Sequence, residues 1–286
     1  MEFVKLAGPA GMFFIMFSLA LSIKTEAFKS IAKNPLSFYL GLVTQLIGMP
    51  LIGFIIALTI PFPKEIKVGI VLITCLPSAV TSNFITKKLG GNVALSISLT
   101  AFTSFFSFIT IPLIVKLYFL VVFADESTII FNTDLIPTSL RIFAIVTVPV
   151  ILGIFFNTIF DEFAKKIDPI FDKLSMVVFL LIIGIAIYQD IELIPEYIRF
   201  AGIKTILIFV LAFFMSINLT KLFKLNQKDS ITIVTETVLQ NGGIGIVLGA
   251  IMFDNVKYIF PVAAYALLQY IFILIYSTYI KISEKN

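Results

Sequence analysis

The stretch Thr235-Glu236-Thr237-Val238-Leu239-Gln240-Asn241-Gly242-Gly243 lies inside an otherwise apolar segment, residues 230–253. Glu236 is the only charged residue of that segment. Charged residues at membrane depth are costly to insert, and they usually face a cavity and mark an ion or proton path. Gln240 follows Glu236 by four residues, so both lie on one face of a helix. Two glycines then allow the helix to unwind, which predicts a broken helix beside an ion site. A protonated Glu236 in a structural hydrogen bond is the alternative.

A second apolar segment, residues 68–86, is interrupted in a similar way by Cys75-Leu76-Pro77-Ser78-Ala79-Val80-Thr81-Ser82-Asn83. Pro77 removes a backbone donor and clashes with the preceding helical turn, and three polar residues follow soon after. A simple proline kink with hydroxyls bonded back to the helix is the alternative. We expect two broken helices, whose second halves begin near residues 80–82 and 241–243.

The composition excludes several classes of protein. Of 286 residues, 59% are hydrophobic and 13% are charged, about half of the roughly 25% charged residues of a soluble domain. An ordinary soluble enzyme, a nucleic-acid binder and a disordered protein are therefore excluded. The chain has no His and a single cysteine, Cys75, so it lacks the residues for His catalysis, thiolate zinc sites and intrachain disulfides. We expect no enzyme and no cofactor other than a coupling ion.

Reading from charge to charge gives nine apolar stretches that reach or approach the about 20 residues of a membrane helix. They are Leu6–Ile23, Leu36–Pro61, Val68–Thr86, Asn92–Val115, Ile142–Phe160, Leu174–Gln189, Thr205–Thr220, Ser230–Phe253 and Tyr258–Ile280. These stretches predict an all-α integral membrane protein with nine transmembrane helices, forming one transmembrane unit over residues 1–286.

The basic residues predict the orientation of these helices. If the N-terminus is outside, 13 of the 21 Lys and Arg residues fall in inside segments. Cytoplasmic loops carry such an excess, so we expect the N-terminus outside and the C-terminus in the cytoplasm, in a bacterial-type inner (plasma) membrane.

The third and eighth spans are the two broken ones. They are five spans apart, so they cross the membrane in opposite directions. Spans 1–4 and 6–9 can therefore form an inverted repeat, with span 5 between them. Interrupted helices at matching positions of two halves indicate the binding site of a secondary transporter.

At these residues the sequence resembles the bile acid:sodium symporter family, in its nine-helix form that lacks the first helix of the ten-helix bacterial members. The most specific match is the Glu236-x-x-x-Gln240-Asn241 motif together with Ser82-Asn83. Weaker matches are Met16–Leu21, Gln45, Pro50, the Cys75–Pro77 segment and Asn92–Thr100.

The resemblance implies sodium-coupled symport of an organic anion, bile-acid-like or a small carboxylate, by alternating access. It implies a panel domain of approximately residues 1–35 and 135–200, and a core domain of approximately residues 36–134 and 201–286. The two broken helices cross within the core. The expected partners are the anion, sodium ions and the lipid bilayer, with no nucleic acid and no required protein partner.

The resemblance also implies two sodium sites that share one carboxylate. The first set is Ser82, Asn83, Ser96, Thr100 and Glu236. The second is Gln45, Glu236, Gln240 and the backbone of Thr237 and Leu239. Sodium is a hard cation that takes oxygen ligands, as these positions provide. Taken alone, Ser96 and Thr100 are equally compatible with hydroxyls bonded to their own helix.

The expected substrate site is the crossing of the two breaks, with Asn241, Val80, Thr81 and Gly242 as its residues. Two opposed half-helix N-termini would face the midplane and attract an anion without Lys or Arg. One departure affects this site. Relatives commonly read Pro-Gly-Gly-Thr-Ala-Ser-Asn where this chain has Ser78, Ala79 and Val80 after Pro77.

Three other functions remain open from the sequence. A proton-coupled or uncoupled anion carrier would use Glu236 as a proton site. An arsenite efflux permease would use a cysteine near the broken helix, where Cys75 lies. A membrane receptor with a transporter-like fold would need no complete set of ion ligands.

Overall fold

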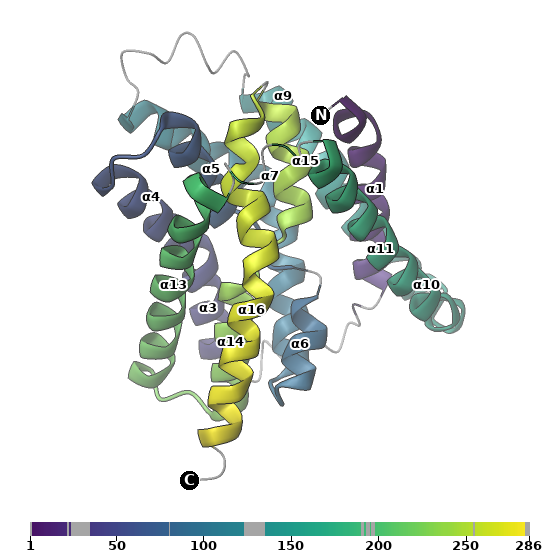
Figure 1. Ribbon diagram of the computed structural model, residues 1–286. Helices are drawn as coiled ribbons and strands as arrows, with labels where there is room; N and C mark the ends of the chain where they lie inside the picture. The colour runs from purple at the N-terminus through teal and green to yellow at the C-terminus, as the bar shows by residue number, and fades with distance from the viewer. Residues whose placement is uncertain are drawn as a thin grey trace.

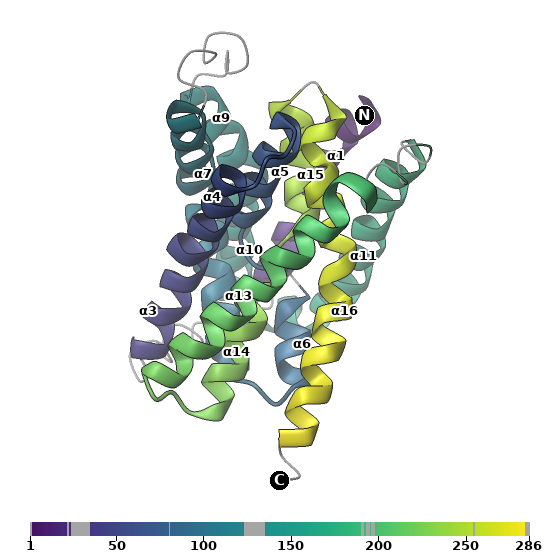
Figure 2. The ribbon, with the colours of Figure 1, turned by 60° about the vertical axis from the view of Figure 1, so that its left-hand side comes forward.

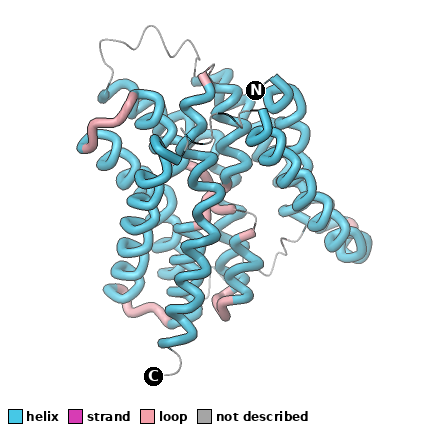
Figure 3. The backbone as a smooth tube through the Cα atoms, in the orientation of Figure 1, coloured by secondary structure: helices cyan, strands magenta, loops and turns pink. Residues whose placement is uncertain are grey.

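The computed structural model describes residues 2–21, 23, 35–79, 81–122, 135–189, 192, 195, 198–253 and 255–283. Regular structure in these ranges is entirely helical (Figure 3). The α-helices are α1 Glu2–Leu21, α3 Pro35–Val43, α4 Met49–Thr59, α5 Lys64–Thr74, α6 Ser82–Lys88, α7 Val93–Val122, α9 Leu135–Ile142, α10 Val148–Ile159, α11 Asp161–Gln189, α13 Ile203–Leu222, α14 Gln227–Val238, α15 Gly242–Met252 and α16 Phe260–Ser283. Three π-helical segments, η1 Thr44–Gly48, η2 Phe143–Thr147 and η4 Ile198–Gly202, and a 3-10 turn, η5 Val256–Ile259, adjoin them.

Five helical stretches in the described ranges are long and apolar enough to cross a bilayer. They are Pro35–Thr59, Val93–Val121, Ile136–Ile159, Lys204–Leu222 and Val256–Ile280. Exposed leucines mark the surfaces that meet lipid: on α7, Leu113, Leu117 and Leu120 lie on one helical face and are about half exposed. Many serines and threonines are buried instead. An apolar exterior around a partly polar interior is typical of a membrane protein, which this chain is.

Two of the long stretches contain a π-helical segment just before a proline. The segment η1 precedes Pro50, and η2 precedes Pro149. Proline cannot donate the usual backbone hydrogen bond, and a single wide turn re-pairs the backbone around it without ending the helix. The wide turn at η1 carries Thr44 and Gln45 as buried residues.

The helix α11 differs from the sequence expectation. We expected a span at Leu174–Gln189 after a basic loop, but one helix begins at Asp161 and continues to Gln189. Asp161 and Glu162 occupy its first turn, where acidic side chains are stabilised by the helix dipole. Asp161 also pairs with Lys165 one turn later. These local interactions make the charged segment helical.

The helices divide into two packing groups. In one group, α1 packs against α10 and α11, and Figure 1 shows these three side by side. At Gly153 the approach is so close that an added Cβ would lie 2.5 Å from the Ala20 Cβ. In the other group, α3–α7 and α13–α16 pack together. The first group contacts the second mainly where α1 packs against α15. The elements α9 and η2, which precede α10 in the chain, also pack against α7 of the second group.

In Figures 1 and 2, α1 begins at the end of the molecule opposite to where α16 finishes.

Candidate functional site

Two interrupted helices meet at the centre of the molecule. The helix α5 ends at Thr74 and α6 begins at Ser82, while α14 ends at Val238 and α15 begins at Gly242. The two connecting segments run antiparallel, with an isolated bridge between Ser78 and Gln240. Both breaks were predicted from Pro77 and from the two glycines, and both second halves begin within the predicted ranges.

Main-chain hydrogen bonds close this crossing. The Ala79 N–H donates to the Leu239 carbonyl over 2.9 Å, and the Asn241 N–H donates to the Pro77 carbonyl over 2.9 Å. These bonds satisfy backbone groups that the broken helices leave unpaired, which a membrane interior requires. The breaks are therefore held at a defined geometry.

The Glu236 side chain lies beside this crossing and is fully buried. Three hydroxyls donate to its carboxylate: Ser96 to Oε1 over 2.5 Å, and Ser78 and Thr100 to Oε2 over 2.6 and 2.8 Å. Among the described residues, no Lys or Arg forms an ion pair with it. A buried carboxylate without a cationic partner costs several kcal/mol, and hydroxyl donors offset only part of that cost.

The remaining residues of the first predicted sodium set lie around this carboxylate. Asn83 Oδ1 lies 2.7 Å from the Ser96 hydroxyl. The hydroxyls of Ser82 and Thr100 are 3.4 Å apart. Neither Ser96 nor Thr100 directs its hydroxyl to its own helix; both bind Glu236 instead. The structure thus brings all five residues together into one cluster of oxygen atoms.

The second predicted set lies next to the first. Gln45 Oε1 lies 3.2 Å from the Ser78 hydroxyl, which also contacts the Glu236 carboxylate. Gln240 Nε2 donates to the Thr237 carbonyl over 2.8 Å, and the Leu239 carbonyl accepts from Ala79. Gln240 Oε1 and Gln45 Nε2 are buried without a hydrogen-bond partner among the described residues. An unpaired buried carbonyl oxygen such as Gln240 Oε1 is a feature that a bound cation would satisfy.

Ser78 belongs to this cluster, although the sequence reasoning treated it only as a departure from relatives. Its hydroxyl contacts the Glu236 carboxylate, the Glu236 carbonyl over 3.1 Å and Gln45 Oε1. This hydroxyl therefore lies between the two sets. Its position directly after Pro77, inside a polar break, was the signal that could have found it.

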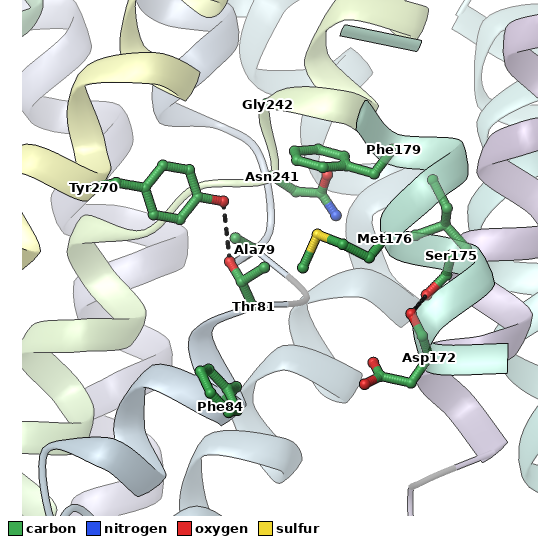
Figure 4. Close-up of a pocket in the computed structure, with 11 residues that line it drawn as sticks. Ala79, Thr81, Phe84, Asp172, Ser175, Met176, Phe179, Asn241, Gly242 and Tyr270 are labelled. Atoms are coloured by element: carbon green, nitrogen blue, oxygen red, sulfur yellow. Dashed lines mark hydrogen bonds between the residues drawn. The ribbon is translucent and has the colours of Figure 1, made fainter. Parts of the chain in front are cut away.

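A cavity of about 210 Å³ opens beside the crossing, between the two packing groups (Figure 4). The breaks contribute Ala79, Thr81, Asn241 and Gly242, and α16 contributes Tyr270, whose hydroxyl lies 3.2 Å from that of Thr81. The opposite wall is one face of α11, formed by Asp172, Ser175, Met176 and Phe179. Three of the four predicted substrate residues therefore line the cavity. The fourth, Val80, lies outside the described residues.

Asn241 provides the polar groups at the upper edge of this cavity. Its Oδ1 caps α15 by accepting from the Ile244 N–H over 3.1 Å. Its Nδ2 is buried and has no partner in the described part of the chain, and Figure 4 shows it pointing toward Met176 across the cavity. A buried unpaired N–H costs about 1–3 kcal/mol, so this group favours a ligand with an acceptor.

A comparison with protein families identifies the chain. The family model described as the sodium bile acid symporter family matches residues 9–197. The chain belongs to this family. Sodium bile acid symporters are transporters and not enzymes, which confirms the resemblance and the expectation that the chain is not an enzyme.

Individual relatives agree with this assignment. The chain is 26% identical over 249 residues to a probable sodium/metabolite cotransporter of the chloroplast from rice, Oryza sativa subsp. japonica, covering 86% of this chain and 57% of that protein. It is 33% identical over 104 residues to a sodium-dependent transporter from Bacillus subtilis, 36% of this chain and 32% of that protein. It is 28% identical over 126 residues to the human ileal sodium/bile acid cotransporter, 44% and 36% of the two chains. The match thus spans little more than half the length of the rice relative.

Proposed function

We propose that the protein is a secondary active transporter that couples the inward movement of sodium to the uptake of a small organic anion. The observation that carries this proposal is the buried Glu236 carboxylate, bound by three hydroxyls at the crossing of two broken helices. Hydroxyl, amide and carboxylate oxygens are ligands for a hard cation, and a cation would neutralise a charge that the described residues leave unpaired.

Two sodium ions would share Glu236. The first ion would take oxygens from Ser82, Asn83, Ser96 and Thr100, which lie around the carboxylate. The second would take Gln45 and Gln240 side-chain oxygens and the Thr237 and Leu239 carbonyls. A hydroxyl that donates to the carboxylate can rotate and offer a lone pair to an ion. Sharing one carboxylate makes the binding of each ion depend on the other.

Alternating access would use the two packing groups as the moving parts. We propose a panel of approximately residues 1–35 and 135–200 and a core of approximately residues 36–134 and 201–286. The packing of α1, α10 and α11 against one another supports this division, and the cavity between the groups supports movement of one past the other. Relative movement of two such units around a midplane site is common in secondary transporters.

We further propose nine membrane crossings, with an inverted repeat that relates α5–α6 to α14–α15, and with the N-terminus outside. The antiparallel contact between the two breaks supports an inverted relation. The opposite ends at which α1 begins and α16 finishes support an odd number of crossings.

The cavity favours a small carboxylate over a bile acid. Its volume of about 210 Å³ lies below the roughly 300–1,000 Å³ of pockets that bury drug-sized ligands. The carboxylate would bind Asn241 Nδ2 and the N-terminus of α15. There the Gly242 N–H bonds the Gln240 carbonyl, whereas the Gly243 N–H has no acceptor in the described structure. Helix N-termini attract anions through such N–H groups.

Uptake by the purified protein in liposomes tests this function. A panel of small organic acids is offered outside in sodium chloride or in choline chloride at equal ionic strength. We expect accumulation of at least one acid in sodium only, and loss of that accumulation in Glu236→Ala. Accumulation that persists in choline and follows an imposed pH gradient would instead establish proton coupling. A Cys75→Ser variant that keeps full transport would exclude a cysteine-based permease.

A further inference from the structure

The wall of the cavity opposite the breaks carries a negative charge. Asp172, Ser175, Met176 and Phe179 follow one another at the spacing of a single helical face on α11, which turns all four side chains to the same side. In Figure 4 the Asp172 carboxylate points into the cavity from this face. Among the described residues that line the cavity, Asp172 alone is charged.

The Asp172 carboxylate has no hydrogen-bond or ion-pair partner in the described part of the chain. The Ser175 hydroxyl, which lies one turn further along, bonds the Asp172 carbonyl over 2.9 Å and not its carboxylate. Asp161 on the same helix is different, because it is paired with Lys165. A carboxylate at the cavity wall repels a second anion placed beside it. A substrate with only acidic groups would therefore be attracted at the Asn241 edge of the cavity and repelled at the Asp172 edge.

A molecule with an acidic group at one end and a basic group at the other would fit both edges of the cavity. Asn241 Nδ2, beside the start of α15, offers a donor to an acidic group. Asp172 offers acceptors and a negative charge to a group of opposite character. We propose that the substrate is a small amphoteric acid, with its carboxylate at Asn241 and α15 and a protonated amine at Asp172.

This inference rests on the proposed function, since it refines the class of organic acid that the same cavity takes. It requires no change in the sodium sites. It predicts that an ammonium group improves binding over a methyl group of the same size, because the ammonium alone would be attracted to the Asp172 carboxylate. Because Asp172 is exposed, we expect an effect of up to about fivefold in affinity.

Isosteric pairs of small acids test the inference on the purified full-length chain. The amino acids β-alanine, γ-aminobutyrate and δ-aminovalerate are each compared with butyrate, valerate and caproate, in which a methyl replaces the ammonium. Binding is measured by calorimetry in sodium chloride and in choline chloride. We expect at least one amino acid to bind more tightly than its methyl counterpart, by up to about fivefold.

Variants assign the preference to one side chain. Asp172→Asn should bring the affinity ratio to about one, and Asp172→Glu should retain it. Asp161→Asn, on the same helix but away from the cavity, should leave the ratio unchanged. Asp172→Lys should reverse the preference and favour glutarate, which carries a carboxylate at each end. Far-UV circular dichroism shows that each variant is folded.

Two outcomes would overturn the inference. One is a wild-type protein for which no amino acid binds better than its methyl counterpart, including the case in which none of the acids binds. The other is an unchanged ratio in folded Asp172→Asn. The comparison of sodium with choline separates the two proposals, because equal binding in both salts would contradict sodium coupling while the affinity ratio would still report on Asp172.

Discussion

Thr100→Val should weaken the first sodium site while leaving the fold intact. The substitution preserves the branched shape of the side chain on α7 and removes only its hydroxyl. That hydroxyl donates to Glu236 Oε2 over 2.8 Å and lies 3.4 Å from the Ser82 hydroxyl, so it would supply one oxygen to an ion bound beside the carboxylate.

The size of the effect follows from the loss of one oxygen ligand to the charged ion, and the strength of a hydrogen bond to a charged group sets its scale. A hydrogen bond to a charged group contributes about 1.5–3 kcal/mol, and each 1.4 kcal/mol is about a tenfold change in an equilibrium constant. We therefore expect the sodium concentration for half-saturation to rise by roughly 10- to 100-fold.

The same helix provides a matched control. Thr103 is also buried, but its hydroxyl donates to the Leu99 and Thr100 carbonyls of its own helix. Thr103→Val should thus keep the sodium response of the wild type. The chain has no Trp, so thermal unfolding followed by far-UV circular dichroism is a suitable assay. A ligand that binds only the folded state raises its stability in proportion to RT ln(1 + [L]/Kd).

Two results would refute the reasoning. One is a sodium midpoint in Thr100→Val within about twofold of the wild type, well below the range expected from a lost charged hydrogen bond. The other is an equal change in Thr103→Val, which would show that the loss of any α7 hydroxyl acts through the fold and not through Glu236.

Four further predictions use other parts of the structure. Gln240→Ala should weaken mainly one of the two sodium-binding steps in calorimetry, because its oxygen belongs to the second site alone; an equal loss of both steps would contradict separate sites. Asn241→Ala should reduce substrate uptake while sodium still raises the unfolding temperature, and unchanged uptake would argue against its role. Gly53→Ala should lower the unfolding temperature by the equivalent of about 1–3 kcal/mol, because the new Cβ would lie 2.1 Å from Thr74 Oγ1; Thr74→Ala should restore part of it. A reporter fused after Asn286 should be cytoplasmic, and an external reporter would overturn the orientation.

The interruptions of the two helices were predictable because their causes are local. Pro77 removes a backbone donor and clashes with the preceding helical turn, and Gly242 and Gly243 favour unwinding. The crossing of the two connecting segments was implied by the family resemblance and not by the local sequence. The structure shows that meeting in the hydrogen bonds between Ala79 and Leu239 and between Asn241 and Pro77.

The start of α11 was not predictable from the rule used, which treated charged residues as loop. Residues 161–173 contain many charged residues and are nevertheless helical. Acidic residues in the first turn of α11 and the Asp161–Lys165 pair stabilise this part of the helix. This difference has a functional consequence, since it places Asp172 on a helical face of the cavity and not in a loop.

The candidate site was partly predictable. The oxygen-bearing residues around Glu236 follow from its isolated charge and from the resemblance, although their roles as sodium ligands stay predictions. Ser78 was missed although it lies in the polar break after Pro77. Tyr270 was missed because its contact with Thr81 depends on packing between segments far apart in the sequence. Nothing in the local sequence of α16 indicates that Tyr270 reaches Thr81.

The crossing of the two breaks is joined by backbone atoms, and this bears on how such proteins diversify. Any residue except proline supplies the N–H that Ala79 and Asn241 donate, and every residue supplies the carbonyl that Pro77 and Leu239 contribute. Substitutions that only exchange these side chains therefore keep the two main-chain bonds. Other positions at the crossing are constrained: the Gln269 side chain accepts from the Gln240 N–H, the Tyr265 hydroxyl donates to the Val238 carbonyl, and a Cβ at Gly242 would lie 2.3 Å from the Ala266 Cβ. Met176, on the opposite wall of the cavity, makes none of these bonds, so the substrate preference can change there while the crossing is kept.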